Sequence, residues 1–403
     1  MPCRADISTL RLVRYNDISG ATVRVRAGFI SLLAGTTLAI SGLSAPVASA
    51  TAARSPSWHV VYRQSGLNVI GVRASGPRNA WAYGNGKLGG GKLLHWNGTR
   101  WAAVSYPRQN TYLITAAFVL SPTDAWFAGQ NETPPQYTPE ILHWQNGSWS
   151  WLQLPSASNV ATVDVLADDD IWSVGGDIPG CPGGGIPGSQ GCTPTEHWNG
   201  TGWRSYPLHT FEWVSFASSS RTNVWAIGAS YGTPGSRNRP ETFVQYAFRW
   251  TGSGWLRSTV AGVRSAWITS LVVDSPTSVW LAGPSRAAPK ACAVRWTGKA
   301  WRPLYLPGHR TCLGAVTDHR RGFWTVLWPG TVIRGRDIVG FAFLHWTGTR
   351  YSVTPTYVPS KNGWNTNGFM ITAVPQSSRV WVYGSYCAVS RVCNNQGVIA
   401  TLS

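Results

Sequence analysis

Apolar and polar residues alternate over short runs along most of this chain, and turn-forming residues separate the runs. One run is ITAAFVL at 114–120; the polar stretch SPTD follows it, and a second run, AWFAG, covers 125–129. A third run ends in LHW at 142–144, and a tight turn leads into WSWLQLP at 149–155. Alternation over four to eight residues predicts half-buried strands. The unit is therefore predicted to contain four antiparallel strands, which we letter a to d.

The turn between strands c and d carries a recurring eight-residue motif. Its first copy, LHWNGTRW at 94–101, has two tryptophans five positions apart with Asn-Gly between them. Asn-Gly between apolar runs predicts a tight hairpin in which both central residues have positive φ. Five further copies keep the five-residue spacing of the aromatic pair: LHWQNGSW at 142–149, EHWNGTGW at 196–203, FRWTGSGW at 248–255, VRWTGKAW at 294–301 and LHWTGTRY at 344–351.

A second signature, one tryptophan in strand b, recurs seven times at intervals of 44 to 57 residues. A period of this size indicates a repeat array, and four short strands per unit are typical of a β-propeller blade. These tryptophans are Trp81, Trp126, Trp172, Trp225, Trp280, Trp324 and Trp381.

The last unit ends at 398–403 without a strand d. The stretch SWHVVYRQ at 57–64 has the pattern of that missing strand and precedes the first strand a. An N-terminal strand that completes the last blade would close the ring and remove a free sheet edge. The sequence therefore predicts an all-β, seven-bladed propeller of four-stranded antiparallel blades. The expected blades are about 66–108, 109–157, 158–208, 209–262, 263–307, 308–360, and 361–403 with 56–64.

Small residues stand where each strand a begins, about ten positions before the strand b tryptophan. Inner strands converge on the propeller axis, so we expect only small side chains to fit there. The residues are Gly71, Thr115, Thr162, Ser215, Thr269, Gly314 and Thr372.

The repeat resembles the secreted β-propeller repeat proteins of bacteria and, more distantly, kelch, sialidase and WD-repeat propellers, over essentially all of 56–403. The resemblance implies an architecture but no single activity, because propellers serve as lectins, hydrolases, lyases, oxidases and scaffolds. No S-x-D-x-G-x-T-W box and no blade-ending Trp-Asp pair occurs, and Gly175-Gly176 is the one match to the paired glycines of kelch oxidases. Copper, flavin or zinc chemistry has no motif here, so we expect no cofactor and no metal.

The first fifty residues have the pattern of a secretory signal peptide. Arg24 and Arg26 precede an apolar run over 27–43, and Ala48-Ser49-Ala50 resembles a cleavage site. A short membrane anchor is the alternative, although the run is shorter than the ~20 apolar residues that a span needs. We therefore expect 51–403 to be one exported, monomeric propeller domain without a later membrane span.

An even number of cysteines remains after residue 50. An even count in an exported protein indicates disulfides, but six cysteines allow fifteen pairings. Proximity in sequence favours Cys181 with Cys192, Cys387 with Cys393, and Cys292 with Cys312.

The chain is strongly basic. Five of its 34 Lys and Arg and two of its 16 Asp and Glu lie in the first fifty residues, so the remainder carries a formal charge of about +15. Such an excess favours polyanionic partners: an anionic glycan, an acidic cell-wall polymer, nucleic acid or a membrane surface. Because we expect export, we predict a glycan or anionic cell-wall polymer, or a surface protein, as the partner rather than nucleic acid. Scattered charge without a function is the alternative.

All length variation falls in the segments that join strands b and c, at 130–140, 176–196, 230–243, 328–340 and 385–397. In a propeller these segments and the d-to-a connections lie on the same face, which we call the long-loop face. Irregular loops on a rigid scaffold commonly carry binding sites. Aromatic rings stack on sugars, and arginines pair with carboxylate, phosphate or sulfate, so we predict a glycan-binding or anionic-polymer-binding face here. Capping of the channel or packing of the loops is the alternative role. The candidate ligand-binding residues are Tyr112, Trp213, Trp267, Trp364, Tyr137, Tyr231, Tyr386, Arg237, Arg239, Arg334, Arg336 and Arg391.

Two other function classes remain open. A glycoside hydrolase or polysaccharide lyase on the same face would need an acid/base pair, for which Asp177, Glu212 and Asp337 are the available carboxylates. The third possibility is a protein-interaction scaffold. The densest acidic group, 168–170, falls in an a-to-b turn, where a solvated turn or a weak cation site is expected.

Overall fold

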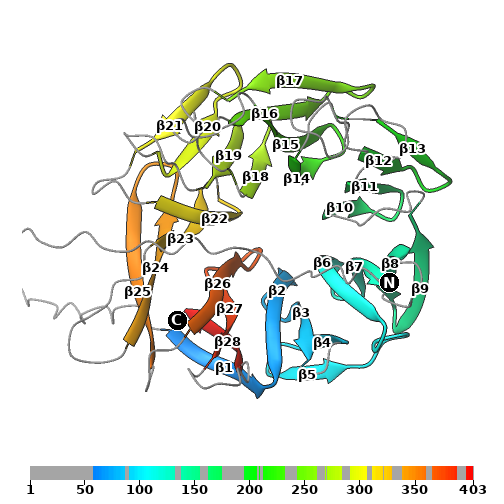
Figure 1. Ribbon diagram of the computed structural model, residues 1–403, viewed down its shortest axis with the longest axis vertical. Helices are drawn as coiled ribbons and strands as arrows, with labels where there is room; N and C mark the ends of the chain where they lie inside the picture. The colour runs from blue at the N-terminus through cyan, green and yellow to red at the C-terminus, as the bar shows by residue number, and fades with distance from the viewer. Residues whose placement is uncertain are drawn as a thin grey trace, which may run out of the picture. The chain divides into compact units, whose positions relative to one another are not determined.

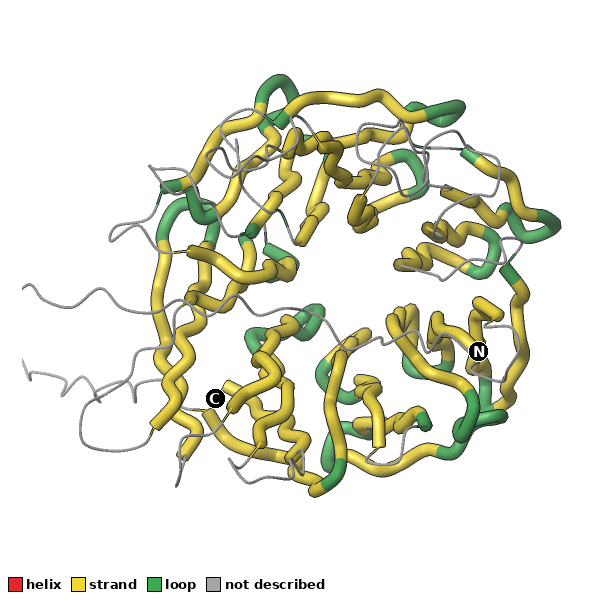
Figure 2. The backbone as a smooth tube through the Cα atoms, in the orientation of Figure 1, coloured by secondary structure: helices red, strands yellow, loops and turns green. Residues whose placement is uncertain are grey.

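The structure is a computed structural model, and the described residues form seven four-stranded antiparallel sheets arranged around a centre (Figures 1 and 2). Among these residues there is no helix, and so none that is long and apolar enough to cross a membrane. The predicted seven-bladed propeller is confirmed. The described residues are 58–86, 90–131, 138–154, 162–174, 195–206, 208, 212–231, 243–260, 268, 270–283, 291–305, 311–320, 322–328, 338–359, 365–387 and 396–402; the expected signal segment lies outside them.

Each blade is a meander whose strand a is innermost. Blade 1 is β2 (Leu67–Gly76), β3 (Asn79–Gly86), β4 (Gly91–Trp96) and β5 (Trp101–Val104). Blade 2 is β6 (Tyr112–Ser121), β7 (Asp124–Asn131), β8 (Thr138–Gln145) and β9 (Ser148–Gln153). Blade 3 is β10 (Thr162–Ala167), β11 (Asp170–Val174), β12 (Thr195–Trp198) and β13 (Trp203–Ser205). Blade 4 is β14 (Glu212–Ser220), β15 (Asn223–Tyr231), β16 (Phe243–Trp250) and β17 (Trp255–Thr259).

The remaining blades follow the same plan. Blade 5 is β18 (Ser270–Ser275), β19 (Ser278–Ala282), β20 (Ala293–Trp296) and β21 (Trp301–Leu304). Blade 6 is β22 (Thr311–Thr317), β23 (Phe323–Trp328), β24 (Ile338–Trp346) and β25 (Tyr351–Pro359). Blade 7 is β26 (Asn365–Ala373), β27 (Val380–Cys387), β28 (Gln396–Leu402) and β1 (Trp58–Ser65).

The two ends of the propeller meet in blade 7. Strand β1 pairs antiparallel with β28, with Trp58 opposite Leu402 and Tyr62 opposite Ile399. The Trp58 ring also packs on Phe343 of blade 6, with centroids 4.9 Å apart. The N-terminal strand therefore supplies strand d of the last blade, as the sequence pattern predicts.

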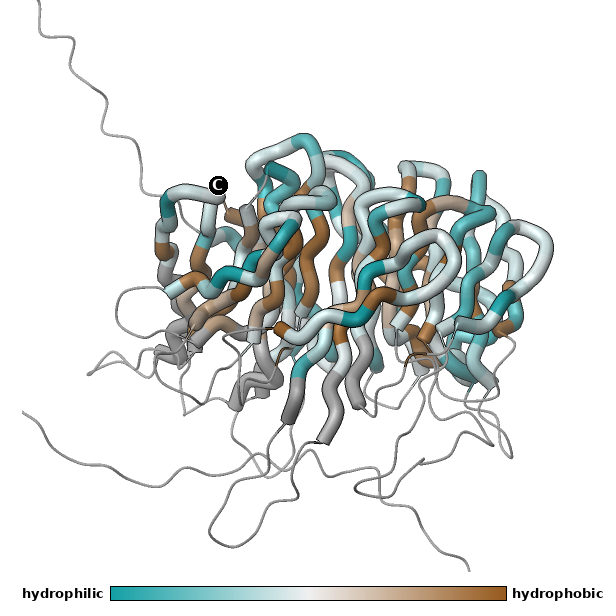
Figure 3. Tube along the Cα trace, turned by 90° about the horizontal axis from the view of Figure 1, so that it is seen from above, coloured by the Kyte–Doolittle hydropathy of each residue, from teal (hydrophilic) through white to brown (hydrophobic). Residues whose placement is uncertain are grey.

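The repeated tryptophans fill the spaces between blades. Trp172 in strand b of blade 3 is 1% exposed and packs against Trp250 and Trp255, the hairpin pair of blade 4, at centroid distances of 4.8 and 5.2 Å. Trp81 makes the same contact with Trp144 and Trp149 of blade 2. Each aromatic buries a large area, so this interlock of successive blades accounts for much of the core. Figure 3 shows apolar residues along the strands and hydrophilic residues at their turns.

Five of the six c-to-d turns differ from the expected form; blade 7 has none, because its strand d comes from the N-terminal end of the propeller. Blade 2 has the expected two-residue turn, in which Asn146 and Gly147 both have positive φ (51° and 86°). In blade 1 the turn is longer: only Gly98 has positive φ, and the Asn97 side chain accepts hydrogen bonds from the backbone N–H groups of Thr99 and Arg100. A side-chain acceptor thus stabilises the turn without placing Asn97 in the left-handed region.

Candidate functional site

Four blades contain the same polar pair beside the strand b tryptophan. In blade 3, the His197 Nε2 lies 2.7 Å from the Asp170 Oδ1, and the imidazole stacks on Trp172 with ring centroids 4.3 Å apart. His197 and Trp172 are direct cross-strand partners, so the register of β11 and β12 fixes the stack. Each pair satisfies its own buried polar groups and stabilises its blade. The other pairs are His95 with Asn79, His143 with Asp124, and His345 with Asp318.

Blade 5 departs from this pattern. Arg295 occupies the histidine position opposite Trp280, and Ser278 occupies the acid position. The Ser278 side chain is 2% exposed, yet its Oγ has no hydrogen-bond partner among the described residues, and neither has the buried Nε of Arg295. The Arg295 guanidinium instead lies 5.2 Å from the centroid of the Trp280 ring. Unpaired buried polar groups cost about 1–3 kcal/mol each, so blade 5 retains donors and acceptors at a cost to its stability.

Blade 4 also has an arginine, Arg249, at the histidine position, but there the buried side chain of Asn223 has hydrogen-bond partners. Asn223 donates from Nδ2 to the Ser219 Oγ at 2.7 Å and accepts from the Trp225 Nε1 at 2.8 Å. Arg249 itself is exposed. The replacement of histidine by arginine therefore opens a buried site in blade 5 because Ser278 is too short to take the place of an Asp or Asn.

The open positions of blade 5 line a hollow at the a-to-b turns of blades 4, 5 and 6. The hollow has a volume of about 760 Å³, and six of its side chains carry hydroxyl groups. Asp274 is the single carboxylate among its lining residues. We call it the blade-5 hollow; it is lined by Ser218, Ser219, Val273, Asp274, Ser275, Thr277, Ser278, Arg295, Thr317, His319 and Arg320.

Asp274 lies at the end of β18 and is half-buried. Its Oδ1 accepts a hydrogen bond from the Thr317 hydroxyl, and its buried Oδ2 has no partner among the described residues. Burial raises the pKa of Asp274 to about 6; the charge of Asp318 acts in the same direction, while the Thr317 hydrogen bond and Arg295 oppose it. The carboxylate is thus ionised at neutral pH and becomes neutral in mild acid.

A channel adjoins the hollow at the centre of the propeller, where the seven inner strands face one another (Figure 1). Its volume is about 620 Å³, and residues from all seven blades line it. Four residues line both spaces: Ser218, Val273, Thr317 and His319. Of the small residues expected at the axis, Thr162, Ser215, Gly314 and Thr372 line the channel.

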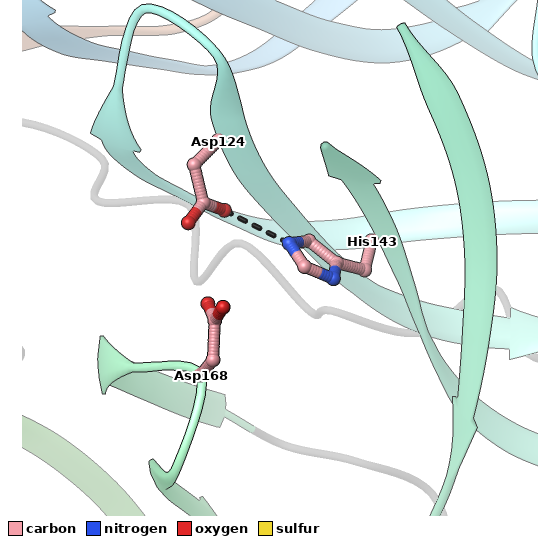
Figure 4. Close-up of side chains that lie close together, drawn as sticks. All are labelled: Asp124, His143 and Asp168. Carbon is pink, nitrogen blue, oxygen red and sulfur yellow. Dashed lines mark hydrogen bonds and ion pairs between the residues drawn. The ribbon is translucent and has the colours of Figure 1, made fainter. Parts of the chain in front are cut away.

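An acidic cluster lies at the boundary of blades 2 and 3 (Figure 4). One ligand atom from each of Asp124, His143 and Asp168 lies within 4.8 Å of the other two, a grouping that could hold a cation. However, Asp124 and His143 form one of the four repeated pairs, and Asp168 accepts a hydrogen bond from Gln145 Nε2 at 3.0 Å. The neighbouring Asp169 pairs with Arg221 of blade 4. These contacts account for the cluster as part of the packing between blades.

Tyr112, predicted to contact a ligand from a connecting segment, lies in the core of blade 2, and its ligand-binding role stays a prediction. Tyr112 is the first residue of β6 and is 0% exposed. Its hydroxyl lies 3.0 Å from the Phe127 carbonyl oxygen and 2.7 Å from that of Glu140, and its ring packs on Trp151. Burial raises the pKa of the Tyr112 hydroxyl well above its usual range. The aromatic residue fills the core of blade 2 because strand a begins earlier than expected.

Strands b and c are also longer than expected. Tyr231 and Tyr386 were expected in loops, but they lie at strand ends, where Tyr231 pairs with Phe243 and Tyr386 with Gln396. Trp213 and Glu212 belong to β14 rather than to a connecting segment. Backbone pairing between the strands extends into the segments that were expected to be loops, so Glu212, Tyr231 and Tyr386 are paired in sheets. Their ligand-binding or catalytic roles stay predictions, as do those of Trp267, Trp364, Tyr137, Arg237, Arg239, Arg334, Arg336, Arg391, Asp177 and Asp337, which lie outside the described residues.

One predicted disulfide is confirmed: Cys292 and Cys312 are bonded, with Cα atoms 5.0 Å apart. The bond joins the region just before β20 of blade 5 to β22 of blade 6. These are the strands that carry Arg295 and Thr317 into the blade-5 hollow. The remaining pairings, Cys181 with Cys192 and Cys387 with Cys393, stay predictions, because three of those cysteines lie outside the described residues and Cys387 is described only as a strand position.

Sequence reasoning missed the blade-5 hollow, although one signal for it was present. The hairpin motifs contain LHW or EHW in four blades and VRW in blade 5, and Ser278 stands where blades 1 to 4 have Asn or Asp. A comparison of the units position by position would have found this double replacement.

Comparisons with known proteins place the chain by fold. No family model matches it, and no curated protein sequence does. Solved structures with a similar fold include YCF48 bound to a D1 peptide (TM-score 0.52, 13% identity, 86% of this chain and 96% of that one) and YCF48 from Cyanidioschyzon merolae (0.51, 15%, 86% and 98%). The β-propeller domain of the Trilobed protease from Pyrococcus furiosus is also similar (0.53, 10%, 84% and 94%). At these identities the likeness establishes the β-propeller fold alone.

Proposed function

We propose that this protein is a non-catalytic binding module for an anionic glycan, such as an acidic cell-surface polymer. The observation that carries the proposal is the blade-5 hollow, in which Ser278 Oγ, Arg295 Nε and Asp274 Oδ2 are buried without partners. A ligand that pairs with these atoms would relieve the cost of their burial. Its volume of about 760 Å³ falls in the usual range for small-ligand sites, roughly 300–1,000 Å³, and would admit one or two sugar units.

The side chains of the hollow match an acidic sugar. Hydroxyl groups can both donate to and accept from sugar hydroxyls. A guanidinium group pairs with a carboxylate or sulfate through charge-assisted hydrogen bonds. Arg295 offers such a group inside the hollow, and the exposed Arg320 offers a second.

The overall charge would bring such a polymer to the surface. The whole chain has a formal net charge of +18. Among the arginines and lysines in the described part of the chain, ion pairs with a carboxylate form only at Arg108 and Arg221. The other cations of the described residues form no ion pair of this kind, and a positive field speeds association with polyanions.

Two further parts of the proposal rest on sequence. The signal-like pattern of the first fifty residues supports binding outside the cell. The presence of one carboxylate, Asp274, among the residues lining the hollow supports a non-catalytic role, because most glycosidases use a pair. Hydrolysis on the long-loop face and a protein-interaction role stay alternatives.

Isothermal titration calorimetry with oligogalacturonate, and with a neutral galactan oligomer of equal length, tests the proposal. The wild type should bind the acidic oligomer at least tenfold more tightly. Arg295→Gln should lower that affinity about tenfold, whereas Arg249→Gln, the same change at the equivalent exposed position of blade 4, should alter it less than twofold.

Two results would overturn this assignment. Equal affinity for the acidic and neutral oligomers would rule out the proposal that the ligand is anionic. Unchanged acidic-oligomer binding in Arg295→Gln, together with its loss in Trp213→Ala/Trp267→Ala, would move the site to the long-loop face.

A further inference from the structure

Seven equivalent positions form a ring in the channel wall. Each lies on an inner strand directly opposite the strand b tryptophan of its blade, and each lines the channel. Five hold uncharged residues: Phe118, Ala217, Val272, Val316 and Thr372. The other two hold opposite charges, Arg73 in blade 1 and Asp164 in blade 3. These charges flank blade 2, whose own ring residue is Phe118.

Asp164 is buried without a full set of partners. The residue is 7% exposed, and its Oδ2 has no hydrogen-bond partner among the described residues. Burial raises the pKa of Asp164 to about 6; the charge of Asp170 adds to this effect, while Ser218 and Arg73 oppose it. At neutral pH the channel wall therefore contains a carboxylate of which one oxygen, Oδ2, has no donor among the described residues.

Arg73 is held in place by contacts within its own blade and with blade 7. Its Nη1 donates to the Val72 carbonyl oxygen at 3.0 Å, and its guanidinium interacts with the Tyr383 hydroxyl of blade 7. Tyr83 lies beside it and occupies space that a side chain at position 71 would need, since a Cβ on Gly71 would lie 2.2 Å from the Tyr83 Cζ. The guanidinium is thus a pre-positioned donor in the wall.

The surface between the two charges is apolar. Phe118 and Ala116 of blade 2 line the channel there. Met370 of blade 7, which is 43% exposed, lines another part of the channel, beside Gly314 of blade 6. A complementary ligand needs a donor for Asp164, an acceptor for Arg73 and an apolar part for Phe118. An amide group provides the donor and the acceptor at its two ends.

We propose that the channel is a second binding site, which takes the acetamido group of an N-acetylated amino sugar. The amide N–H donates to Asp164, the carbonyl oxygen accepts from Arg73, and the methyl group with one face of the sugar ring lies on Phe118. The channel volume of about 620 Å³ is sufficient for one such sugar. This inference shares the glycan class with the proposed function but uses different residues, so either can fail alone.

The test is saturation-transfer NMR and calorimetry with N-acetylglucosamine, using glucose and glucosamine as matched probes. The full-length wild type should bind N-acetylglucosamine at least tenfold more tightly than glucose or glucosamine. Asp164→Leu and Arg73→Met should each lower the affinity at least tenfold. Ala217→Ser, a change at the equivalent ring position of blade 4, should alter it less than twofold.

A folding control accompanies these variants. Asp164→Leu replaces a buried carboxylate with an apolar group of similar size: it removes the unpartnered Oδ2 but also the interactions with Ser218 and Arg73, so its Tm should stay close to that of the wild type. Asp164→Asn serves as a second variant if the leucine is not accommodated, and it should lower the affinity at least threefold.

The site would be overturned by equal binding of N-acetylglucosamine and glucose, or by wild-type affinity in folded Asp164 variants. Failure of the oligogalacturonate experiment leaves this outcome untouched, because that ligand is assigned to Arg295 and the blade-5 hollow.

Discussion

Blades 3 and 5 follow the same four-strand plan but treat one buried position in opposite ways. In blade 3, Asp170 and His197 pair with each other at 2.7 Å beside Trp172. In blade 5 the corresponding Ser278 and Arg295 have buried polar atoms without partners, and a hollow opens beside them. The other blades of a repeat protein thus show which contacts a blade normally makes. A unit that gives up an internal contact present in its sister units is expected to do so for a function.

The largest effect is expected at the boundary of the open blade. Cys292→Ala/Cys312→Ala should lower the free energy of unfolding by about 3 kcal/mol, because the bond closes a loop with a sequence separation of 20 residues. Chemical denaturation under oxidising conditions measures this. Both proteins under reducing conditions are the control and should be equally stable, because reduction leaves neither with this bond and breaks any other disulfides in each. Equal stability of the two proteins under oxidising conditions would show that the bond does not stabilise this boundary.

The next prediction compares the two positions directly. Asp170→Ala should destabilise the protein by about 2 kcal/mol, because it leaves His197 without its charged partner. Ser278→Ala should change the free energy of unfolding by less than about 0.5 kcal/mol, because the Ser278 Oγ has no partner to lose. Urea unfolding of both variants tests the contrast. Equal losses would mean that Ser278 is a structural residue and that the two blades do not differ as described.

A graft would convert the open blade into a closed one. Ser278→Asp/Arg295→His restores the pair found in blade 3 and should raise the free energy of unfolding by about 1 kcal/mol. The same change should lower the affinity for oligogalacturonate about tenfold. Arg249→His in blade 4, where Asn223 is already satisfied, is the matched control and should leave that affinity within twofold. Wild-type affinity in the Ser278→Asp/Arg295→His variant would show that these blade 5 residues do not bind the ligand.

The smallest effect concerns pH. The pKa of Asp274 is raised to about 6, mainly by burial, so this carboxylate is ionised above pH 6 and neutral below it. Neutralisation removes repulsion of an anionic ligand. His319 also gains a positive charge as the pH falls, although burial lowers its pKa and so moves this step to lower pH. Affinity for oligogalacturonate should therefore rise roughly fivefold as pH falls from about 7 to 5. Asp274→Asn should flatten the part of the affinity curve centred near pH 6. An unchanged curve would show that Asp274 does not cause the pH dependence.

The fold was largely predictable because it rests on repeated positions. The interval between strand b tryptophans and the strand-like pattern at 57–64 were sufficient for seven blades and for the closing pair of β1 and β28. The Cys292–Cys312 bond also followed from spacing. Strand ends were less predictable, because ladder pairing extends through polar residues once a neighbouring strand is present, as at Tyr231 and Tyr386.

The candidate sites were harder to predict because they depend on contacts across blades. Tyr112 has the composition of a ligand-binding aromatic, but its position relative to Phe127 and Glu140 makes it a core residue. Ser278 is an ordinary turn residue in the sequence. Its significance depends on the length of the side chain that its sister blades have there, and on the convergence of blades 4, 5 and 6 around it.

The pairing of β1 with β28 also has a consequence for how the molecule is made. A chain synthesised from its amino end produces Trp58–Ser65 before any of its partners and Gln396–Leu402 last. The first strand must therefore remain unpaired while six complete sheets form, with an edge open to aggregation. Contacts between such distant parts of a chain form slowly, so the final step of folding is expected to be the joining of these two strands. The first strand is therefore expected to need protection from aggregation until Gln396–Leu402 has been synthesised.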